Sequence, residues 1–442
     1  MPFKLKLPTG FAAALLCVAS TAHAGRTDPA KPDVTAITQV SGDGQRLTAV
    51  VLTYDEPLAN VPLAVGDFAV KDRRVTRAYV SDRAEPGAAA TGQFVVIELA
   101  ADDPAATLKV EPPRRGSPPA AEPGLGGMAG PPPGMAAPTF RPAVATVERV
   151  PEFHAADGSI KSPIGSPLVS SAVRNLVVDS FTQHVFSDPV TGDRLVYNLF
   201  IPADYDPDRA YPLVLFMHDA GNTGSDPLIT LRQGNGATVW AEPQNQAKHP
   251  AIVIAPQYAA QTVNDRSEAT SLLDTTVHLV DFLTQQYSID RDRLYSTGQS
   301  GGAMMTIAMN IKYPDLFAAS YIVAGQWDPA FVAPLAEDRL WITVAEGDLK
   351  AFPGQNAITK TLEAKGATVA RAQWDGRSTP AQFDARASEL IAKGAPINYV
   401  ALTKGTVVRA GQPDNGGSNH TNTWRIAYSI DAIREWLMHQ HR

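Results

Sequence analysis

The sequence contains one cysteine among its 442 residues, Cys17, so the chain cannot form an internal disulfide. Its folded state must therefore rely on hydrophobic cores, with bound ligands as a further source of stability left open. The apolar run near the start is too short to serve as a permanent membrane anchor, and no further run is long enough to cross a bilayer. The formal net charge of −7 and a pI near 5.7 exclude the strongly basic surface that nucleic acids and anionic membranes attract.

Residues 1–24 have the features of a secretory signal peptide. Lys4 and Lys6 precede a short apolar core, and the segment closes on Ala22-His23-Ala24. We expect cleavage near Ala24 and a secreted or periplasmic protein with no membrane anchor. Leu16 precedes Cys17 where a lipoprotein signal has a small residue, so lipid attachment is not expected. The mature chain would contain no cysteine.

Residues 28–155 show no helical periodicity and consist of short β-rich runs separated by turn residues. The spacing of these runs predicts a small β-sandwich, and Ser41-Gly42-Asp43-Gly44 is a hairpin signal between the first two. The region has no metal-ligand spacing and no catalytic pair. The predicted strands are 35–40, 47–54, 68–70, 75–80, 94–99 and 107–110.

A segment rich in proline and glycine occupies residues 111–142. Such a composition cannot bury enough apolar surface to form a core. Because 144–150 is again typical of a strand, we interpret the segment as an insertion before the last strand of the sandwich. In that case the second domain begins near residue 165 and runs to 442. The alternative is that the segment is itself the interdomain linker.

Residues 165–442 alternate short apolar strands with helical patterns. The clearest helix is 271–287, where Leu272, Val277, Val280 and Leu283 fall on or near one face. This alternation predicts an α/β fold with a mostly parallel sheet covered by helices on both faces, and an active site at the carboxyl edge of the strands. The expected strands are 185–186, 195–201, 211–217, 251–255, 294–297, 319–324, 340–345 and 397–402.

The most informative stretch is Gly298-Gln299-Ser300-Gly301-Gly302, which follows an apolar strand and precedes a periodic helix. A Gly-x-Ser-x-Gly turn in this context is a nucleophile elbow, in which a strained serine projects its hydroxyl above the sheet. Glycines two residues before and after the serine allow neighbouring backbone to approach closely. We therefore expect Ser300 to be a nucleophile, with an accidental surface turn as the alternative.

A serine nucleophile requires a histidine base and a carboxylate, which in this fold follow in the order Ser, Asp, His. Asp348 comes directly after the apolar strand 340–345 and is the expected acid, with Glu346 as its nearest rival. His420 is the expected base, in a polar loop between strand 397–402 and a final helix. Apart from His218, the other histidines of the mature chain are expected to be solvated or packed, and they are His154, His184, His249, His278, His439 and His441.

A tetrahedral intermediate also needs backbone N–H donors for its oxyanion. One comes from the residue after the nucleophile, here Gly301. The other comes from the loop after an early strand, here Ala220 in His218-Asp219-Ala220-Gly221 after strand 211–217. His218 precedes the serine in the chain and is expected to organise this loop.

Ser300 in its elbow, the His218–Gly221 loop and the run from His420 to Tyr428 resemble the α/β-hydrolase esterases with an N-terminal immunoglobulin-like domain, related to polyhydroxybutyrate depolymerases and feruloyl esterases. The resemblance covers nearly the whole mature chain. It implies an immunoglobulin-like fold for the sandwich and carboxylesterase activity with a Ser300, Asp348 and His420 triad. Asp219 departs from the glycine that often follows the histidine in related hydrolases.

Candidate substrate-pocket residues lie in loops near the expected site. They are Trp240, Trp327 and Phe331, with Gln299 beside the nucleophile; for the aromatic residues, core packing is the alternative. The acidic turn 204–208 invites a calcium interpretation, but Pro207 and the absence of a glycine-turned ligand loop favour a solvated turn. We therefore expect no metal and no cofactor.

Three functions are compatible with these residues. The first is a secreted serine carboxylesterase acting through an acyl-enzyme on a small-molecule or polymer-linked ester, including aryl esters. The second is a serine peptidase of the same fold, because the same triad chemistry cleaves amides. The third is a non-catalytic binding protein, which the complete set of triad residues argues against. The sequence leaves the oligomeric state open.

Overall fold

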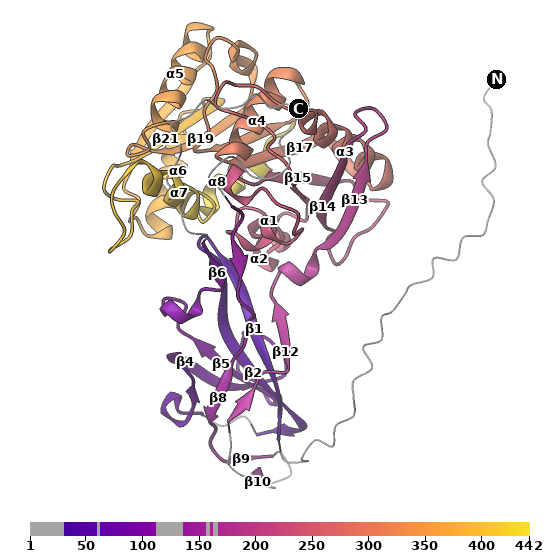
Figure 1. Ribbon diagram of the computed structural model, residues 1–442, viewed down its shortest axis with the longest axis vertical. Coiled ribbons are helices and arrows are strands. Elements are labelled where there is room, and N and C mark those ends of the chain that lie inside the picture. The colour runs from indigo at the N-terminus through magenta and orange to yellow at the C-terminus, as the bar shows by residue number, and fades with distance from the viewer. Residues whose placement is uncertain (1–30, 60–61, 112–135, 156–159, 162–166) are drawn as a thin grey trace, which may run out of the picture.

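The computed structural model describes residues 31–59, 62–111, 136–155, 160–161 and 167–442. The described chain forms a β-rich N-terminal domain and a larger α/β domain stacked above it in Figure 1. The expected signal peptide and most of the proline- and glycine-rich segment lie outside the described residues. Within the described ranges, no helix combines the length and the apolar character that a membrane span requires.

The main sheet of the first domain has five strands in the order β12-β1-β2-β5-β4. The tight turn Ser41-Gly42-Asp43-Gly44 joins β1 to β2, as the hairpin signal predicts, and Gly44 takes a φ of 96° there. All neighbours pair antiparallel except β12, which runs parallel to β1. The strands are β1 (Asp33–Ser41), β2 (Gly44–Leu58), β4 (Val75–Ser81), β5 (Gly92–Leu99) and β12 (Ala172–Asn175).

A three-stranded sheet, ordered β11-β8-β3, completes the sandwich. Alternate residues of both sheets point inward and form one hydrophobic cluster, which includes Leu52, Ile97 and Val147, and Phe153 of β9 packs into the same cluster. Burial of this cluster is the main stabilising contribution to a domain without disulfides. The strands are β3 (Ala69–Val70), β8 (Thr146–Arg149) and β11 (Leu168–Val169), with the small pairs β6 (Lys109–Val110) with β7 (Thr139–Phe140) and β9 (Phe153–His154) with β10 (Ile160–Lys161).

The strand pairing bears on the predicted domain boundaries. β11 and β12 lie beyond residue 165, yet each pairs with a strand of the first domain. β6 immediately precedes the proline- and glycine-rich segment, β7 lies near the end of it, and the two strands pair with each other, so the two ends of the segment lie close together within the first domain. We therefore propose that the first domain extends to Asn175 and that the segment is an insertion in it.

The second domain contains a nine-stranded sheet in the order β13-β14-β16-β15-β17-β18-β19-β21-β20. β14 pairs antiparallel with both β13 and β16, and the remaining pairs are parallel. The strands are β13 (Thr182–Ser187), β14 (Arg194–Phe200), β15 (Tyr211–Met217), β16 (Ile252–Gln257), β17 (Ile289–Gln299), β18 (Ala319–Val323), β19 (Leu340–Ala345), β20 (Val369–Trp374) and β21 (Ile397–Leu402).

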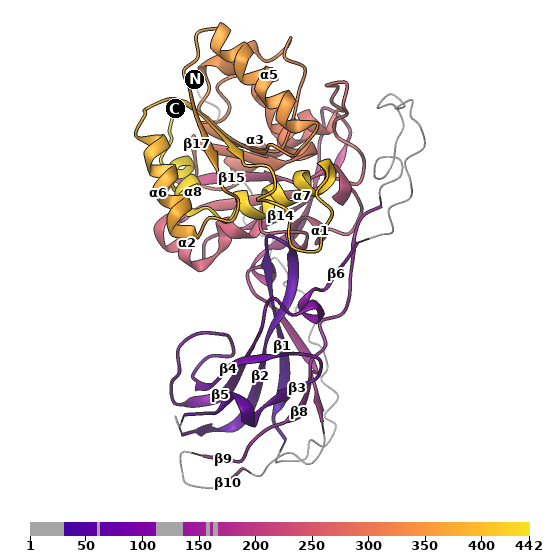
Figure 2. The same cartoon turned by 90° about the vertical axis from the view of Figure 1, so that its left-hand side faces the viewer.

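Helices cover both faces of this sheet, which Figure 2 shows nearly edge-on. α3 packs with α4 on one face, together with α5, and α6 packs with α8 on the other, together with α7. The predicted α/β class with a mostly parallel sheet is therefore confirmed. The helices are α1 (Ile229–Arg232), α2 (Pro243–Lys248), α3 (Leu272–Gln286), α4 (Gly301–Lys312), α5 (Ala351–Ala364), α6 (Pro380–Ile391), α7 (Gly416–Ala427) and α8 (Asp431–Met438).

Within the nine-stranded sheet, the strand that the sequence did not predict is β20, at the edge. Its burial alternates irregularly because one side of an edge strand faces solvent, so it lacks the continuous apolar run of a central parallel strand. By contrast, β15, β19 and β21 are buried along their whole length, and their bounds match the predicted runs 211–217, 340–345 and 397–402.

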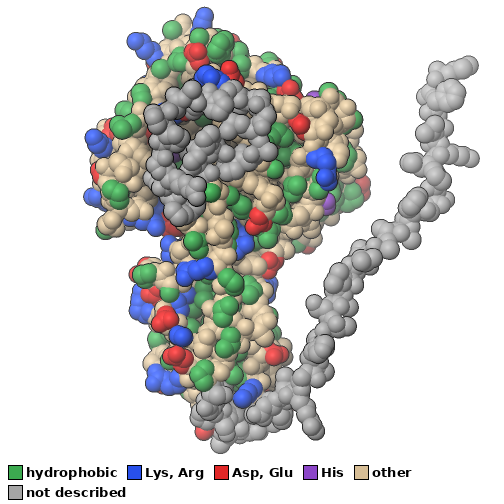
Figure 3. Space-filling view, viewed as in Figure 1, with side chains coloured by type: hydrophobic (Ala, Val, Ile, Leu, Met, Phe, Trp, Pro, Cys, Tyr) green, Lys and Arg blue, Asp and Glu red, His purple; other side chains and the backbone are tan. Residues whose placement is uncertain are grey.

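The two domains meet where the β1–β2 turn reaches the underside of the α/β domain, beside α1 and α7 (Figure 2). Asp43 pairs with Arg409 and lies 3.8 Å from Arg425, and the backbone of Gly42 lies against that of Arg425. Arg232 Nε donates to Gln45 Oε1 at 2.5 Å. The first domain is thus tied to the second by specific polar contacts. Elsewhere on the face shown in Figure 3, basic and acidic side chains are intermixed.

Candidate active site

Ser300 occupies the sharp turn between β17 and α4. Its backbone has φ 52° and ψ −116°, which is strained for a residue with a side chain. Two hydrogen bonds hold this conformation: Ser300 N–H donates to Val323 O, and Met304 N–H donates to Ser300 O, both at 2.9 Å. The turn therefore has the geometry of a nucleophile elbow at the carboxyl end of a central strand.

The glycines on either side of Ser300 allow the backbone to pack too closely for any other residue. A Cβ atom at Gly302 would lie 2.0 Å from Met217 O of β15, and one at Gly298 would lie 2.4 Å from the carbonyl carbon of Gly302. Real Cβ atoms essentially never come this close to backbone. Helix α4 is thus pressed against β15 and β17 at its first turn, and this contact fixes the position of Ser300.

Gly302→Ala is therefore expected to destabilise the fold, because the added methyl group overlaps a backbone carbonyl that cannot move aside. Overpacking of this kind costs about 1–3 kcal/mol or more. The measurement is the free energy of unfolding from denaturant titration. Gly66→Ala is the matched control, since nothing lies within 4 Å of its Cβ position. Equal stability of the two variants would contradict this packing argument.

His420 lies in the second turn of α7, where the sequence predicted a loop. The helix begins at Gly416 because Asn415 caps it: its side chain accepts a hydrogen bond from Ser418 N–H at 3.0 Å. The loop prediction was wrong: the two successive glycines, Gly416 and Gly417, are typical of a loop, but they form the first turn of the helix that Asn415 caps. A helix holds the imidazole more firmly than a loop, and Trp424 packs edge-on against the ring at 5.1 Å.

Ser300, His420 and Asp348 form one chain of hydrogen bonds although 120 residues separate the first two. His420 Nε2 lies 2.8 Å from Ser300 Oγ, and His420 Nδ1 lies 2.5 Å from Asp348 Oδ2. Asp348 is 2% exposed, whereas Ser300 and His420 are half-buried. The carboxylate is thus shielded while the serine and the imidazole remain accessible from solvent.

Asp348 is held ionised by its neighbours. Burial raises the pKa of its carboxyl, but hydrogen bonds from His420 and from the backbone N–H groups of Lys350 and Ala351 outweigh burial and lower the pKa below its usual value. The rival Glu346 has other partners: it accepts from Gln373 Nε2 at 2.7 Å and from the Lys404 N–H at 2.9 Å. Of the two carboxylates, Asp348 alone meets the histidine.

The loop after β15 brings a second backbone amide beside the elbow. Ala220 begins the short 3-10 helix η4 (Ala220–Asn222), and its nitrogen lies 3.2 Å from the position that a Cβ of Gly301 would take. Because Gly301 carries no Cβ, the amide of Ala220 can approach this closely. The amides of Ala220 and Gly301 are therefore neighbours beside Ser300, as two donors for one oxyanion need to be.

Asp219 is the centre of a buried polar network beneath this loop. Its Oδ1 accepts from Gly221 N–H at 3.0 Å, and its Oδ2 accepts from the side chains of Asn222 at 2.5 Å and Gln299 at 2.9 Å. Both amides also donate to Gln233 Oε1, at 2.5 and 3.0 Å. Gln299, predicted to contact the substrate, is 1% exposed, and its side-chain amide donates within this network.

Sequence reasoning missed Asn222 and Gln233, which come from different elements and carry no local pattern. His218, expected to organise the loop, is fully buried: its Nδ1 donates to Asp219 O at 2.7 Å and its Nε2 accepts from Tyr258 N–H at 3.0 Å. Burial lowers its pKa. A neutral imidazole with one donor and one acceptor satisfies both bonds.

The candidate pocket aromatics have different environments. Trp240 is 3% exposed, donates its Nε1–H to Gly236 O, and lines a small cavity with His249 and Met438 on the side of α2 and α8. This placement favours core packing for Trp240. Trp327 is also buried in the core, and Phe331 is 57% exposed on the loop after β18. Of these three residues, only Phe331 has an exposed ring.

Two family models match parts of the chain. The esterase Ig-like N-terminal domain model matches residues 33–161. The prolyl oligopeptidase family model matches residues 262–403, which include Ser300 and Asp348 and end before His420. The first match covers most of the β-sandwich, and the second covers the central part of the α/β domain, including the elbow.

Several curated relatives are esterases. Acetylxylan esterase A of Emericella nidulans is 29% identical over 150 residues, covering 25% of this chain and 49% of the relative. The poly(3-hydroxybutyrate) depolymerase of Ralstonia pickettii is 26% identical over 223 residues, covering 47% of this chain and 45% of the relative. The chain thus spans less than half the length of these curated relatives.

A solved structure extends the likeness to both domains. The crystal structure of a thermostable esterase superposes with a TM-score of 0.72 at 25% identity, covering 93% of this chain and all of that chain. The resemblance drawn from the Ser300 elbow and the His218–Gly221 loop is therefore confirmed. This chain is an α/β-hydrolase-fold protein similar to esterases with an N-terminal immunoglobulin-like domain, related to the poly(3-hydroxybutyrate) depolymerase and feruloyl esterase group.

Proposed function

We propose that this protein is a serine carboxylesterase that hydrolyses carboxylic esters through an acyl-enzyme intermediate on Ser300. The observation that carries the proposal is the hydrogen-bonded chain from Asp348 through His420 to Ser300, with the serine at a strained elbow. A weak nucleophile, a base within hydrogen-bond distance and a carboxylate that orients the base are what acyl transfer requires.

In the acylation step, Ser300 Oγ attacks the ester carbonyl carbon while its proton moves to His420 Nε2. The carboxylate of Asp348 accepts the Nδ1–H of His420, which fixes the tautomer with a free Nε2 and stabilises the imidazolium as it forms. The carbonyl oxygen becomes an oxyanion, and the backbone N–H groups of Ala220 and Gly301 donate to it.

Collapse of the tetrahedral intermediate breaks the bond to the alcohol, which takes the proton from His420 and leaves. The acyl group remains on Ser300. Water then attacks the acyl-enzyme, with His420 accepting the water proton and returning it to Ser300 Oγ as the acid leaves. Both half-reactions use the same three side chains and the same two backbone donors.

We propose small-molecule and polymer-linked esters as the substrates, including aryl esters. Named relatives include acetylxylan esterase A, poly(3-hydroxybutyrate) depolymerase and a probable feruloyl esterase C, which share a carboxylic ester as the bond cleaved. Leu349, next to Asp348, is 79% exposed, and Phe331 is also exposed. Such apolar side chains can contact a substrate too large to be enclosed.

We further propose that the protein is exported, since the sequence predicts a signal peptide ending at Ala24.

A serine peptidase is the second candidate, because the prolyl oligopeptidase family model matches residues 262–403. The triad geometry serves amides as well as esters. The two candidates differ in the leaving group, which is an amine in one and an alcohol in the other. Substrate preference therefore has to be measured directly.

The deciding experiment compares purified wild type with Ser300→Ala on a panel of substrates. The panel contains p-nitrophenyl acetate and butyrate, methyl ferulate, acetylated xylan, poly(3-hydroxybutyrate) film and proline p-nitroanilides. We expect wild-type turnover of one or more esters, with kcat/KM for esters far above that for anilides. Turnover of anilides alone would support the peptidase, and no turnover of any substrate would contradict both candidates.

Asp219→Asn is expected to lower kcat on a small ester by roughly 10- to 100-fold with a smaller change in KM. The substitution replaces one carboxylate oxygen, which accepts hydrogen bonds from N–H groups, by an NH2 group, which can only donate. The N–H groups then lose their acceptor, and the loop that carries Ala220 shifts. Loss of a whole oxyanion donor costs about 10²–10³ in kcat, so a misplaced donor should cost less. Asp226→Asn, in the same segment but exposed, is the control. Equal kcat values for the two variants would contradict a positioning role for Asp219.

A further inference from the structure

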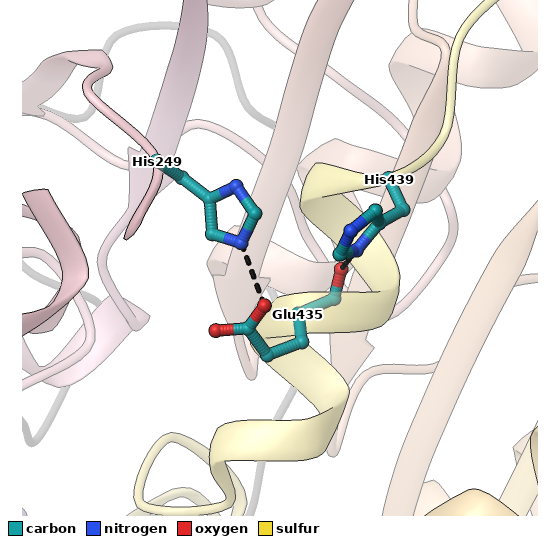
Figure 4. A group of neighbouring side chains, drawn as sticks. All are labelled: His249, Glu435 and His439. Carbon is teal, nitrogen blue, oxygen red and sulfur yellow. Dashed lines mark hydrogen bonds and ion pairs between the residues drawn. The ribbon is translucent and has the colours of Figure 1, made fainter. Parts of the chain in front are cut away.

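A cluster of ligand-type side chains lies far from the triad. His249 follows α2, Glu435 lies on α8, and His439 follows Glu435 by one helical turn, as Figure 4 shows. One ligand atom from each residue lies within 4.8 Å of the others. His249 precedes β16 at the amino edge of the sheet, whereas Ser300 follows β17 at the carboxyl edge. The cluster therefore takes no part in the proposed ester chemistry.

The two histidines and the carboxylate already face one another. His249 Nε2 lies 2.6 Å from Glu435 Oε2, and the two imidazole rings are 5.1 Å apart at 84°. In a tetrahedral zinc site with Zn–N bonds of about 2.0–2.1 Å, ligand atoms lie roughly 3.3 Å apart. The three ligand atoms here lie within 4.8 Å of one another, and metal binding would draw them to that spacing.

The protonation pattern of His439 suits a metal ligand. Its Nδ1 lies 2.6 Å from Glu435 O and donates a proton to that carbonyl, which leaves the lone pair on Nε2. A second hydrogen bond of this kind orients the ring and makes the other nitrogen a better ligand. His249 Nε2–H faces Glu435 Oε2, which accepts its proton in a hydrogen bond. On metal binding this proton moves to Nδ1 or to solvent, and the metal takes its place between nitrogen and carboxylate.

Rigid elements carry the ligands. Helix α8 is fixed in the core by Ile433, Leu437 and Trp436, whose ring packs against Trp341 at 5.4 Å. On the other side, the Gln246 side chain donates to Ala251 O and accepts from Ala251 N–H, so it closes the segment that contains His249. Both ligand-bearing segments are thus held independently of any metal.

The charges around the cluster are balanced. Lys248 donates to Glu435 Oε1 at 3.0 Å and to Asp431 Oδ2 at 2.7 Å, and Arg434 donates to Asp431 Oδ1 at 2.9 Å. Two carboxylates therefore offset two cations. Glu435 Oε2 faces His249, so one carboxylate oxygen points into the cluster while the other is occupied by Lys248.

We propose that His249, Glu435 and His439 form a zinc site that clamps the C-terminal helix α8 to the segment between α2 and β16. Two imidazole nitrogens and one carboxylate oxygen are ligands that zinc prefers, and water would complete a tetrahedron because His439 is exposed. The clamp joins residues that are 186 positions apart in the chain, and it acts on stability and not on the ester reaction.

The test is titration calorimetry of untagged, EDTA-treated protein with zinc chloride at pH 7.5. We expect one equivalent of zinc to bind. His249→Gln and His439→Gln are each expected to weaken binding on the order of tenfold or more. His441→Gln, two residues beyond His439 and outside the cluster, is the matched control and should bind as wild type does. Circular dichroism checks that each variant is folded.

Thermal unfolding gives an independent readout. Zinc that binds the folded state should raise the wild-type Tm by mass action, with no such rise in His249→Gln. The proposal is overturned if wild type shows no saturable zinc binding, if His249→Gln and His439→Gln bind as wild type does, or if His441→Gln loses as much affinity as His439→Gln.

Discussion

Ser300→Ala is expected to reduce kcat on a small p-nitrophenyl ester by on the order of 10⁴-fold or more while leaving the fold intact. Removing the hydroxyl removes the atom that forms the acyl-enzyme, and only binding and the oxyanion donors remain to assist direct attack by water. Ser300 lies on a half-buried turn, where its hydroxyl is hydrogen-bonded to His420, so removal of the hydroxyl leaves no cavity in the core. The measurement is steady-state kinetics, with circular dichroism and Tm for the fold.

His420→Ala is expected to cause a loss of similar size, and the double variant should lose little beyond either single one. Triad members act as a unit, because the serine is activated only through the histidine. Multiplicative losses in the double variant would show that Ser300 and His420 act independently. That result would contradict the hydrogen-bonded chain as the catalytic device.

Asp348→Asn is expected to lower kcat by roughly 10³- to 10⁴-fold, less than the loss of the serine. An asparagine whose amide NH2 faces His420 donates to Nδ1, which places the imidazole proton on Nε2 and removes the lone pair that must accept the serine proton. The Asp348 carboxylate also accepts from Lys350 and Ala351 N–H, so the variant is checked for stability as well as turnover.

Glu346→Gln is the matched control for this prediction, because it lies two residues away at the end of the same strand and binds Gln373 and Lys404. It should retain near wild-type kcat. If Glu346→Gln lost activity while Asp348→Asn remained active, the acid would be misassigned.

The pKa of Asp348 also links its ionisation to the stability of the fold. Because this pKa is lowered in the folded state, the contribution of the ionised carboxylate to the free energy of unfolding is present at neutral pH and is lost as pH falls through the lowered pKa.

The sequence by itself determined the features that depend on neighbouring residues. Fully buried parallel strands must be continuously apolar, so 340–345 and 397–402 were found to the residue. The elbow required glycines around Ser300 because adjacent backbone leaves no room for a Cβ, and that requirement is visible within five residues. Ser300, Asp348 and His420 follow the ends of β17, β19 and β21, and the order of these strands along the chain is visible in the sequence.

Other features arise only from contacts between distant segments, and the tertiary structure decided them. Asn222 and Gln233 join Gln299 around Asp219 because the helix η4, the end of α1 and the end of β17 converge there, and no local pattern marks them. The parallel pairing of β12 with β1, on which we base the proposed end of the first domain, joins segments that are far apart in the sequence, and no local pattern marks it.

The same distinction explains why His420 could be named while its helix could not. Its residue type and chain position are local facts, but the preference of Asn415-Gly416-Gly417 for a helix over a loop is small and is settled by packing of α7 against β18 and β19. The pairing of His249 with Glu435 is likewise invisible until α8 packs beside α2. Backbone preferences and apolar periodicity are encoded locally, whereas side chains from distant segments meet only after the cores have formed.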